Sequence, residues 1–458
     1  MKPMPITDAL FLMGEVREKP LHVGGLQLFR PPEDAAPGSV REGYQRAIEH
    51  GDVATLFRRH PRRSLAGLGP WEWTEDAELD LEYHVRHSAL PHPGEIRELL
   101  ALVSRLHGTL LDRNRPLWEI HLIEGLADGR IASYSKVHHS MLDGVAAMRW
   151  MVRGLSPDPD ERGMAPPWAP RGVSSPSLPD GTALDKVRGL ARDAVEGGRA
   201  VGEASLAAVR TMARALEDRA ASLPYQAPRS SLNVPITGAR RFAAQSWDMD
   251  RIRVVADAHG GSVNDVVLAM SSGALRRYLL DQGDLPDQPL VSAVPVSLRG
   301  DDDAPGGGGN AVGVVLCNLG THLSEPEARF DLIHRSMRDS KAQLKGLGPM
   351  AVILLSAINF GPVALGPLFR YELLRKPAFN IVISNVPGPE EPLYWNGARL
   401  EGIYPVSVPY DGQALNITVT SYAGSLEFGL IGCRRRVPRL QRLLTHLEDS
   451  LAELEATA

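Results

Sequence analysis

The spacing of apolar residues in the first part of the chain predicts both helices and strands. Val145, Met148 and Val152 recur at the interval of one helix face, which indicates a helix with one buried side. The apolar runs before them are strand-like. The predicted elements are a helix over 94–108, strands over 116–126 and 130–139, and a helix that begins near Asp143.

The second part of the chain repeats this mixture. Its predicted elements are helices over 263–282, 326–345 and 438–456, and strands over 290–298, 310–320, 379–386, 414–424 and 425–433. Interleaved helices and strands in both parts predict an α/β fold, and no short-period repeat is detectable.

A long connector separates these two parts. Residues 156–181 contain seven prolines among Ser, Gly and Asp, a composition that suits an extended linker. The Ala-rich stretch that follows predicts one or two surface helices. Because 458 residues exceed the size of a single core, we expect two halves, 1–155 and 226–458, joined by a crossover over 156–225.

Composition and charge exclude several classes of function. A net charge of −5 offers no basic field for a nucleic-acid backbone. The two cysteines, Cys317 and Cys433, lie far apart without metal-site spacing, which indicates a reducing compartment and no disulfide framework. The apolar run near the N-terminus is shorter than the core of a signal peptide. We therefore expect a cytoplasmic protein.

Residues 346–369 form an uncharged stretch that is long enough to span a bilayer. Three prolines interrupt it, which disfavours a spanning helix. A buried core helix, the wall of an acyl-chain tunnel and a surface that faces a membrane remain open.

The known nucleophile and phosphate motifs are absent from the sequence. It contains no GxSxG, P-loop, HExxH or GxGxxG at a strand-to-helix turn, which disfavours covalent serine catalysis and nucleotide hydrolysis. The glycine tract at 301–310 is typical of a flexible loop.

The stretch "HHSMLDG" at 138–144 carries the main candidate chemistry. Successive residues of a strand point to opposite faces, so His138 and His139 are expected to diverge. This divergence disfavours a metal site, although metal binding and two structural histidines remain alternatives. The third hypothesis is that His139 is a general base, because a pKa of about 6.5 leaves a neutral imidazole at neutral pH.

Asp143 has two possible roles in this stretch. It can orient the imidazole, or it can turn away and hold the loop through an arginine such as Arg299. Gly144 after it permits a tight turn or a close approach to a ligand.

Four ordered motifs give the chain a family resemblance. They are "RPLWE" (115–119), "HHSMLDG" (138–144), "VNDVVLA" (263–269) and "ISNVPGP" (383–389). With them the chain resembles, from end to end, the bacterial wax ester synthase/diacylglycerol acyltransferase family. This resemblance implies two α/β halves like those of chloramphenicol acetyltransferase and peptide-synthetase condensation domains, with a channel between them.

The resemblance also implies roles for individual residues. It makes His139 the general base and His138 its supporting neighbour, and it makes Asp143 mainly structural, paired with an arginine. The residues assigned in this way are His139, His138, Asp143 and Asn264 as catalytic; Gly144, Trp118, Asp265, Ser384 and Asn385 as substrate-binding; and Arg299, Pro116 and Leu117 as structural. Asn264 can donate to the oxyanion, whereas Asp265 can equally be an acid at a helix N-terminus.

The activity implied by the resemblance is transfer of a fatty acyl group from acyl-CoA to diacylglycerol or a long-chain alcohol, without metal, cofactor or covalent intermediate. Apolar substrates imply peripheral contact with the inner face of the membrane or with lipid bodies. Two alternatives remain: a condensation-type enzyme that uses a carrier-protein thioester, and a lipid-binding relative without catalysis.

Overall fold

The computed structural model describes residues 2–36, 38–64, 69–170, 226–297, 312–345 and 376–458. Four features of the sequence fall wholly or mostly outside these ranges: the crossover from residue 171 on, Arg299, the glycine tract and the apolar stretch 346–369.

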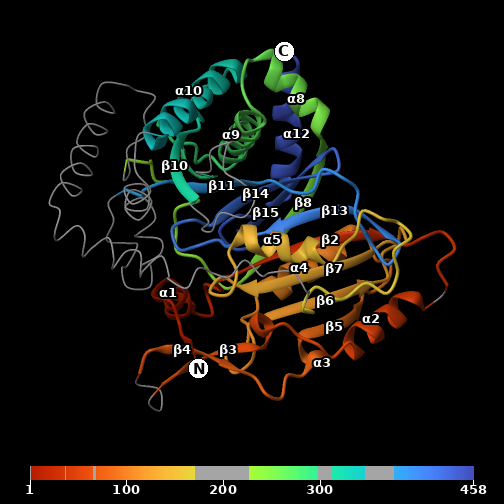
Figure 1. Ribbon diagram of the computed structural model, residues 1–458. Helices are drawn as coiled ribbons and strands as arrows, with labels where there is room; N and C mark the ends of the chain where they lie inside the picture. Colours follow the sequence, from red (N-terminus) through yellow and green to blue (C-terminus); the bar gives the residue numbers. More distant parts are fainter. Residues whose placement is uncertain (1, 37, 65–68, 171–225, 298–311, 346–375) are drawn as a thin grey trace.

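Two six-stranded sheets organise the chain (Figure 1). The first has the order β12 (Tyr394–Trp395), β13 (Ala398–Val406), β2 (His22–Arg30), β7 (Ile131–His138), β6 (Trp118–Glu124) and β5 (Val85–Ala89). The second has the order β10 (Val312–Asn318), β9 (Val291–Ser297), β11 (Ile381–Val386), β14 (Leu415–Tyr422), β15 (Ser425–Cys433) and β8 (Arg240–Asp248). A small third sheet contains β1 (Lys2–Pro3), β4 (Trp71–Glu75) and β3 (Arg59–Arg63).

Both large sheets are mixed. In the first, β5 runs parallel to β6 and the other pairs are antiparallel. In the second, β11 runs parallel to both β9 and β14. Mixed sheets flanked by helices confirm the predicted α/β class with two similar halves.

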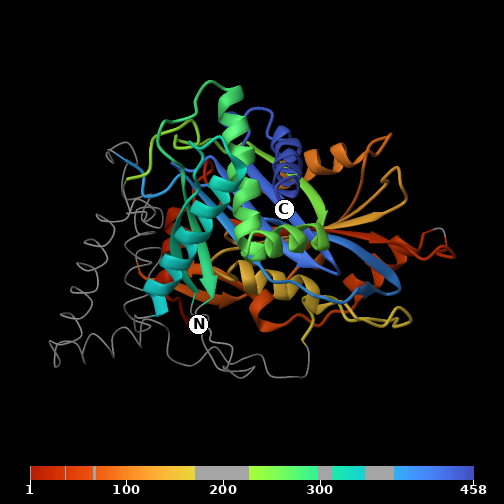
Figure 2. The same cartoon turned by 90° about the horizontal axis from the view of Figure 1, so that it is seen from above.

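Four helices cover one face of the second sheet. They are α8 (Met249–Ala258), α9 (Val263–Asp281), α10 (Pro326–Lys345) and α12 (Arg442–Glu455). Figure 1 shows them grouped above the strands, and in Figure 2, which is seen from above, they lie in front of the strands. Helix α9 packs against the other three. Together with the sheet they enclose the largest apolar core among the described residues.

In the first half, two helices pack on opposite faces of the sheet. Side chains of α5 (Gly144–Arg153) join Val137 in one apolar cluster, whereas those of α4 (Ile96–His107) join Tyr134 in another. A side chain at Gly25 of β2 would collide with Met151 of α5, its Cβ lying 2.3 Å from the sulfur, so glycine permits this close contact. The remaining helices here are α1 (Ile6–Gly14), α2 (Ser39–Glu49), α3 (Leu81–His84) and a short 3-10 helix, Thr55–Arg58.

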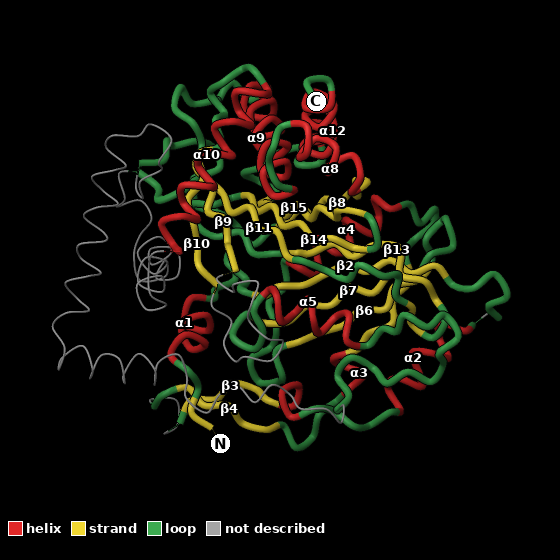
Figure 3. Tube along the Cα trace, turned by 45° about the horizontal axis from the view of Figure 1, so that its top comes forward, coloured by secondary structure: helices red, strands yellow, loops and turns green. Residues whose placement is uncertain are grey.

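The strand β13 ties the two halves together. It comes from the second part of the chain yet pairs with β2 of the first, Val406 opposite Gly24. Figure 3 shows β13 between β2 and the strands of the second sheet. A Cβ at Gly429 of β15 would lie 1.8 Å from the carbonyl oxygen of Pro405, so the strands approach as closely as glycine allows. The division into 1–155, 156–225 and 226–458 stays a prediction, and the sheets do not follow it strictly.

No helix among the described residues combines the length and the apolar character needed to cross a bilayer.

Candidate functional site

The two histidines of "HHSMLDG" lie where β7 ends, and the backbone fixes both of them. The N–H of His138 donates to the carbonyl of Leu117 at 2.9 Å, and the N–H of His139 donates to the carbonyl of Leu21 at 2.9 Å. These two hydrogen bonds therefore fix the backbone positions from which the two rings project.

The ring of His138 is wholly buried; its Nδ1 is hydrogen-bonded, and its Nε2 makes no hydrogen bond with a described residue but faces a carboxylate. Its Nδ1 accepts from the Ser140 N–H at 3.1 Å and lies 2.7 Å from the Ser140 hydroxyl oxygen. Its Nε2 lies 3.5 Å from Oε1 of Glu15. Because Nδ1 accepts, the proton belongs on Nε2, facing the carboxylate. This arrangement suits a supporting residue.

The ring of His139 is half-buried and makes no hydrogen bond with another described residue. It stacks on Phe11, with ring centroids 4.3 Å apart and planes 13° from parallel. Its Nδ1 is buried, which leaves Nε2 as the nitrogen that a substrate can reach. Burial lowers the pKa of His139, and the nearby carboxylate of Asp143 opposes this effect. The ring is therefore neutral and able to accept a proton at neutral pH.

Asp143 begins the helix that follows. Its Oδ1 accepts from the Ala146 N–H at 2.8 Å, so it is the N-cap of α5. This role was not among those that the sequence suggested. Gly144 is the first residue of α5, and a Cβ there would have no described atom within 4 Å. Since Arg299 lies outside the described residues, its pairing with Asp143 stays a prediction.

The "PLW" residues pack behind the histidines. Leu117 is buried and supplies the carbonyl that holds the His138 backbone, and Pro116 before it is buried too. Trp118 is fully buried; its indole N–H donates to the Phe57 carbonyl at 2.8 Å and its ring stacks on His84. A substrate contact would require the indole to leave this cluster, so the packing favours a structural role.

The "ND" residues begin α9. Asp265 forms a capping box with Ser262: its Oδ2 accepts from the Ser262 N–H at 2.9 Å, and Ser262 Oγ accepts in return from the Asp265 N–H at 3.3 Å. The same Oδ2 lies 3.1 Å from Nδ1 of His334. Asp265 thus acts as the acid at a helix N-terminus. Asn264 is half-buried, and its side chain makes no hydrogen bond with a described residue.

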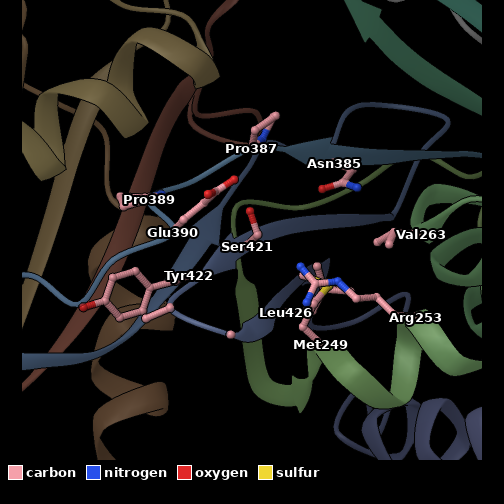
Figure 4. Close-up of a pocket in the computed structure, with 12 residues that line it drawn as sticks. Met249, Arg253, Val263, Asn385, Pro387, Pro389, Glu390, Ser421, Tyr422 and Leu426 are labelled. Carbon is pink, nitrogen blue, oxygen red and sulfur yellow. The ribbon is translucent and has the colours of Figure 1, made fainter.

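A pocket of about 460 Å³ opens where β11, the β14–β15 turn and α8 meet. Figure 4 shows Asn385 on one side and Arg253 on the other. The full lining is Met249, Arg253, Val263, Asn385, Pro387, Pro389, Glu390, Ser421, Tyr422, Ala423, Gly424 and Leu426. The pocket thus brings Asn385 near the start of α9. Ser384 does not line it, and neither do the two histidines.

The contribution of α1 to the site is not predicted by the sequence motifs. Phe11 and Glu15 contact the two histidine rings, although more than 120 positions separate them from the motif. The available signal was an acidic residue directly after a short apolar run, which alone does not predict a buried carboxylate.

Within the described part of the chain, no group of three or more His, Cys, Asp or Glu side chains is arranged to hold a metal ion. The expectation of metal-free catalysis stays a prediction.

Comparison with known proteins identifies the class. The fold aligns over 99% of this chain with the first condensation domain of the calcium-dependent antibiotic synthetase (95% of that chain), with a TM-score of 0.57 at 16% identity, a likeness of fold alone. Residues 4–267 match the wax ester synthase/diacylglycerol acyltransferase catalytic domain, and residues 308–455 match the C-terminal domain of the same family. The chain therefore belongs to the wax ester synthase/diacylglycerol acyltransferase family and is an acyltransferase.

Individual relatives align over nearly their full length. A probable diacylglycerol O-acyltransferase of Mycobacterium tuberculosis is 49% identical over 457 residues, 99% of each chain. The O-acyltransferase WSD of Acinetobacter baylyi is 42% identical over 465 residues, 99% of this chain and 97% of that one. The wax ester synthase/diacylglycerol acyltransferase from Marinobacter aquaeolei superposes with a TM-score of 0.79 at 44% identity, covering 100% of this chain and 99% of its own.

Proposed function

We propose that this acyltransferase transfers a fatty acyl group from acyl-CoA to the hydroxyl of diacylglycerol or of a long-chain alcohol, with His139 as general base. The observation that carries the proposal is the imidazole of His139. Its backbone is fixed, burial lowers its pKa, and its ring makes no hydrogen bond with another described residue. A neutral imidazole whose Nε2 can be reached by substrate can accept the hydroxyl proton of an alcohol.

The proposed reaction balances without any further group. Nε2 of His139 takes the hydroxyl proton as the alcohol oxygen attacks the thioester carbonyl, which forms a tetrahedral oxyanion. When this intermediate collapses, the C–S bond breaks and the imidazolium returns the proton to the sulfur of CoA. The products are an ester and free CoA, so no covalent enzyme intermediate, metal or cofactor is required.

Asn264 is proposed to donate to the oxyanion, because its half-buried amide at the start of α9 has no partner among the described residues. Asn385, which lines the pocket, is a proposed substrate contact. Ser384, Gly144 and Asp265 are proposed as substrate contacts from the family motifs, with the carboxylate of Asp265 also held in the capping box. The structural role proposed for Asp143 includes an ion pair with Arg299. Each of these roles is carried over from the family motifs.

The apolar substrates also lead us to propose where the reaction takes place. Acceptor and acyl chain partition into lipid, so we place the enzyme in the cytoplasm, in peripheral contact with the membrane or with lipid bodies. For residues 346–369, which lie outside the described ranges, a buried core helix, a tunnel wall and a surface that faces the membrane all stay open.

The central test is His139→Ala, assayed with palmitoyl-CoA and either dioleoylglycerol or hexadecanol. We expect kcat/KM to fall about 10²-fold or more, because the proton acceptor is lost. The matched control is His138→Ala, which should cost less. Circular dichroism checks that both variants fold. Near wild-type activity of His139→Ala, or the reverse order of the two losses, would show that the base is misassigned.

Product chromatography in the same assay separates the alternatives. Triacylglycerol or wax ester formed from free acyl-CoA supports the proposal and identifies the acceptor. Turnover only with a carrier-protein thioester would favour the condensation-type alternative, and lipid retention without ester would favour a non-catalytic relative.

A further inference from the structure

One turn of α1 contacts both histidines of the motif. Phe11 stacks on the ring of His139, and Glu15, the C-cap of the helix, faces the ring of His138. We propose that α1 is a positioning element of the active site, in which Phe11 fixes the plane of the His139 ring and Glu15 fixes the ring of His138 and the backbone between them. This inference rests on the proposed role of His139 as base.

Glu15 is linked to both histidines by short contacts. Its Oε1 accepts from the Leu21 N–H at 2.9 Å, and the carbonyl of the same Leu21 accepts from the His139 N–H at 2.9 Å. Oε1 also lies 3.5 Å from Nε2 of His138. One carboxylate therefore holds the His138 ring directly and the His139 backbone through a single residue.

The charge of Glu15 is maintained although its side chain is fully buried. Burial by itself opposes ionisation, but the His138 ring, the Leu21 N–H and the Arg113 guanidinium together lower the pKa of Glu15. Arg113 also donates to the main-chain carbonyl of Glu15 at 3.1 Å. An ionised carboxylate with this many partners is a rigid support, because each partner that is lost leaves the buried charge less well compensated.

Phe11 and Glu15 act from the same helical turn. Residues four apart share one face of a helix, and the Glu15 N–H donates to the Phe11 carbonyl at 3.1 Å. Since the His139 ring has no hydrogen bond with another described residue, the stack on Phe11 is a contact that restrains its rotation. The stack on Phe11 thus orients the imidazole, as the carboxylate does in a catalytic triad.

The test uses the full chain with two variants of α1 and two controls. Glu15→Gln keeps the shape and removes the charge, and Phe11→Leu removes the stacking face. We expect kcat to fall about ten-fold or more in each, since a small misplacement of a reacting group is costly, with KM for both substrates unchanged. Phe11→Tyr keeps the ring and should retain activity.

The matched control for Glu15→Gln is Glu119→Gln. Glu119 is also a buried carboxylate of the first half, 3.1 Å from the ammonium of Lys136, but it contacts neither motif histidine. Its loss should lower the melting temperature while kcat stays near the wild-type value. A purely structural role of Glu15 would give the same pattern.

The pH profile provides a second readout. The charged and titratable groups that face the pair or its carboxylate within the described residues are Glu15, Arg113, Lys136, Asp143 and His22. Only Glu15 changes in Glu15→Gln. Because a negative charge stabilises a nearby imidazolium, its removal should move the acid limb of kcat/KM to lower pH, and Glu119→Gln should leave that limb in place.

The outcomes separate this inference from the proposed function. If His139→Ala retains activity, the proposed function is wrong. If His139→Ala is inactive but Glu15→Gln behaves like Glu119→Gln and Phe11→Leu like Phe11→Tyr, the positioning role of α1 is wrong while the function stands. Should Glu15→Gln fail to fold, the comparison of Phe11→Leu with Phe11→Tyr decides.

Discussion

At the scale of single residues, the acidic residue of the motif, Asp143, caps a helix. Asp143 accepts a hydrogen bond from the Ala146 N–H and so satisfies one of the unpaired donors at the start of α5. Its carboxylate also suits the positive end of the helix dipole. The hydrogen bond between Asp143 and the first turn of α5 therefore helps to fix the turn that follows His139.

Replacing Asp143 should reveal this capping role. Asp143→Ala should lower the free energy of unfolding by about 1 kcal/mol, whereas Asp143→Asn, which can still cap, should lose less. Urea denaturation followed by circular dichroism measures both. Asp143→Asn as unstable as Asp143→Ala would mean that the charge matters more than the cap. The predicted ion pair would then appear as non-additivity between Asp143→Ala and Arg299→Ala.

The residues of the site differ in how far the sequence could predict them. The divergence of His138 and His139 follows from strand alternation, and the capping role of Asp265 from its place at the start of a helical pattern. Glu15 and Phe11 could not be predicted, because their partners come from a strand end more than 120 positions away. The local sequence around the motif does not indicate which residues far away in the sequence will contact it in the folded chain.

At the scale of elements, α4 and β7 are joined by buried polar groups. The end of α4 contributes His107, whose Nδ1 lies 2.8 Å from the Tyr134 hydroxyl and whose Nε2 lies 2.9 Å from the Ser407 carbonyl. Burial lowers the pKa of His107 to about 3. The neutral ring is thus part of the folded structure, and it links both halves of the chain.

This histidine should make stability depend on pH. In the unfolded chain it binds a proton below a pKa of about 6.5, and in the folded chain only below about 3. Between these values the unfolded state holds more protons, so the contribution is complete above pH 6.5 and is lost as pH falls, at about 1.4 kcal/mol per unit. Comparing urea denaturation at pH 7 and pH 5, we expect a smaller difference for His107→Gln than for wild type.

The matched control for that comparison is His92→Gln, because His92 is exposed on the surface of the folded chain. It should show the wild-type difference between the two pH values. An unchanged difference in His107→Gln would mean that other groups carry the pH dependence.

The elements predicted best are those whose apolar residues recur regularly along one continuous stretch of sequence. Helices α4, α9 and α10 and strands β14 and β15 agree with their predicted ranges to within a few residues. The small sheet of β1, β4 and β3 and the placement of β13 were not predicted. Strand order depends on pairing between segments far apart in the sequence. The period of apolar residues in one strand does not determine which strand it pairs with.

At the scale of the whole molecule, the halves meet where β13 and β15 approach. The backbone of Pro405 occupies the space that a side chain at Gly429 would need. A backbone carbonyl cannot swing aside as a flexible side chain can. The separation of the two sheets is therefore fixed at this point by the lack of a Cβ atom.

Gly429→Ala should force the sheets apart. We expect the free energy of unfolding to fall by about 1–3 kcal/mol and activity to decline, because the inserted methyl must displace backbone. Gly43→Ala in α2 is the control: its Cβ would lie 3.6 Å from the Trp395 ring, an ordinary contact, and should be neutral or stabilising. Equal thermal stability of Gly429→Ala and wild type would show that the interface can relax.

The position of β13 has a consequence for the synthesis of the protein. Its strand partner, β2, emerges from the ribosome almost 370 positions before β13 does. During this interval one side of β2, with the sequence "HVGGLQLFR", has no partner for its N–H and C=O groups. Such a bare edge invites pairing with other chains. Nascent chains halted before Ala398 should therefore depend on chaperones for solubility, whereas the finished chain closes the edge itself.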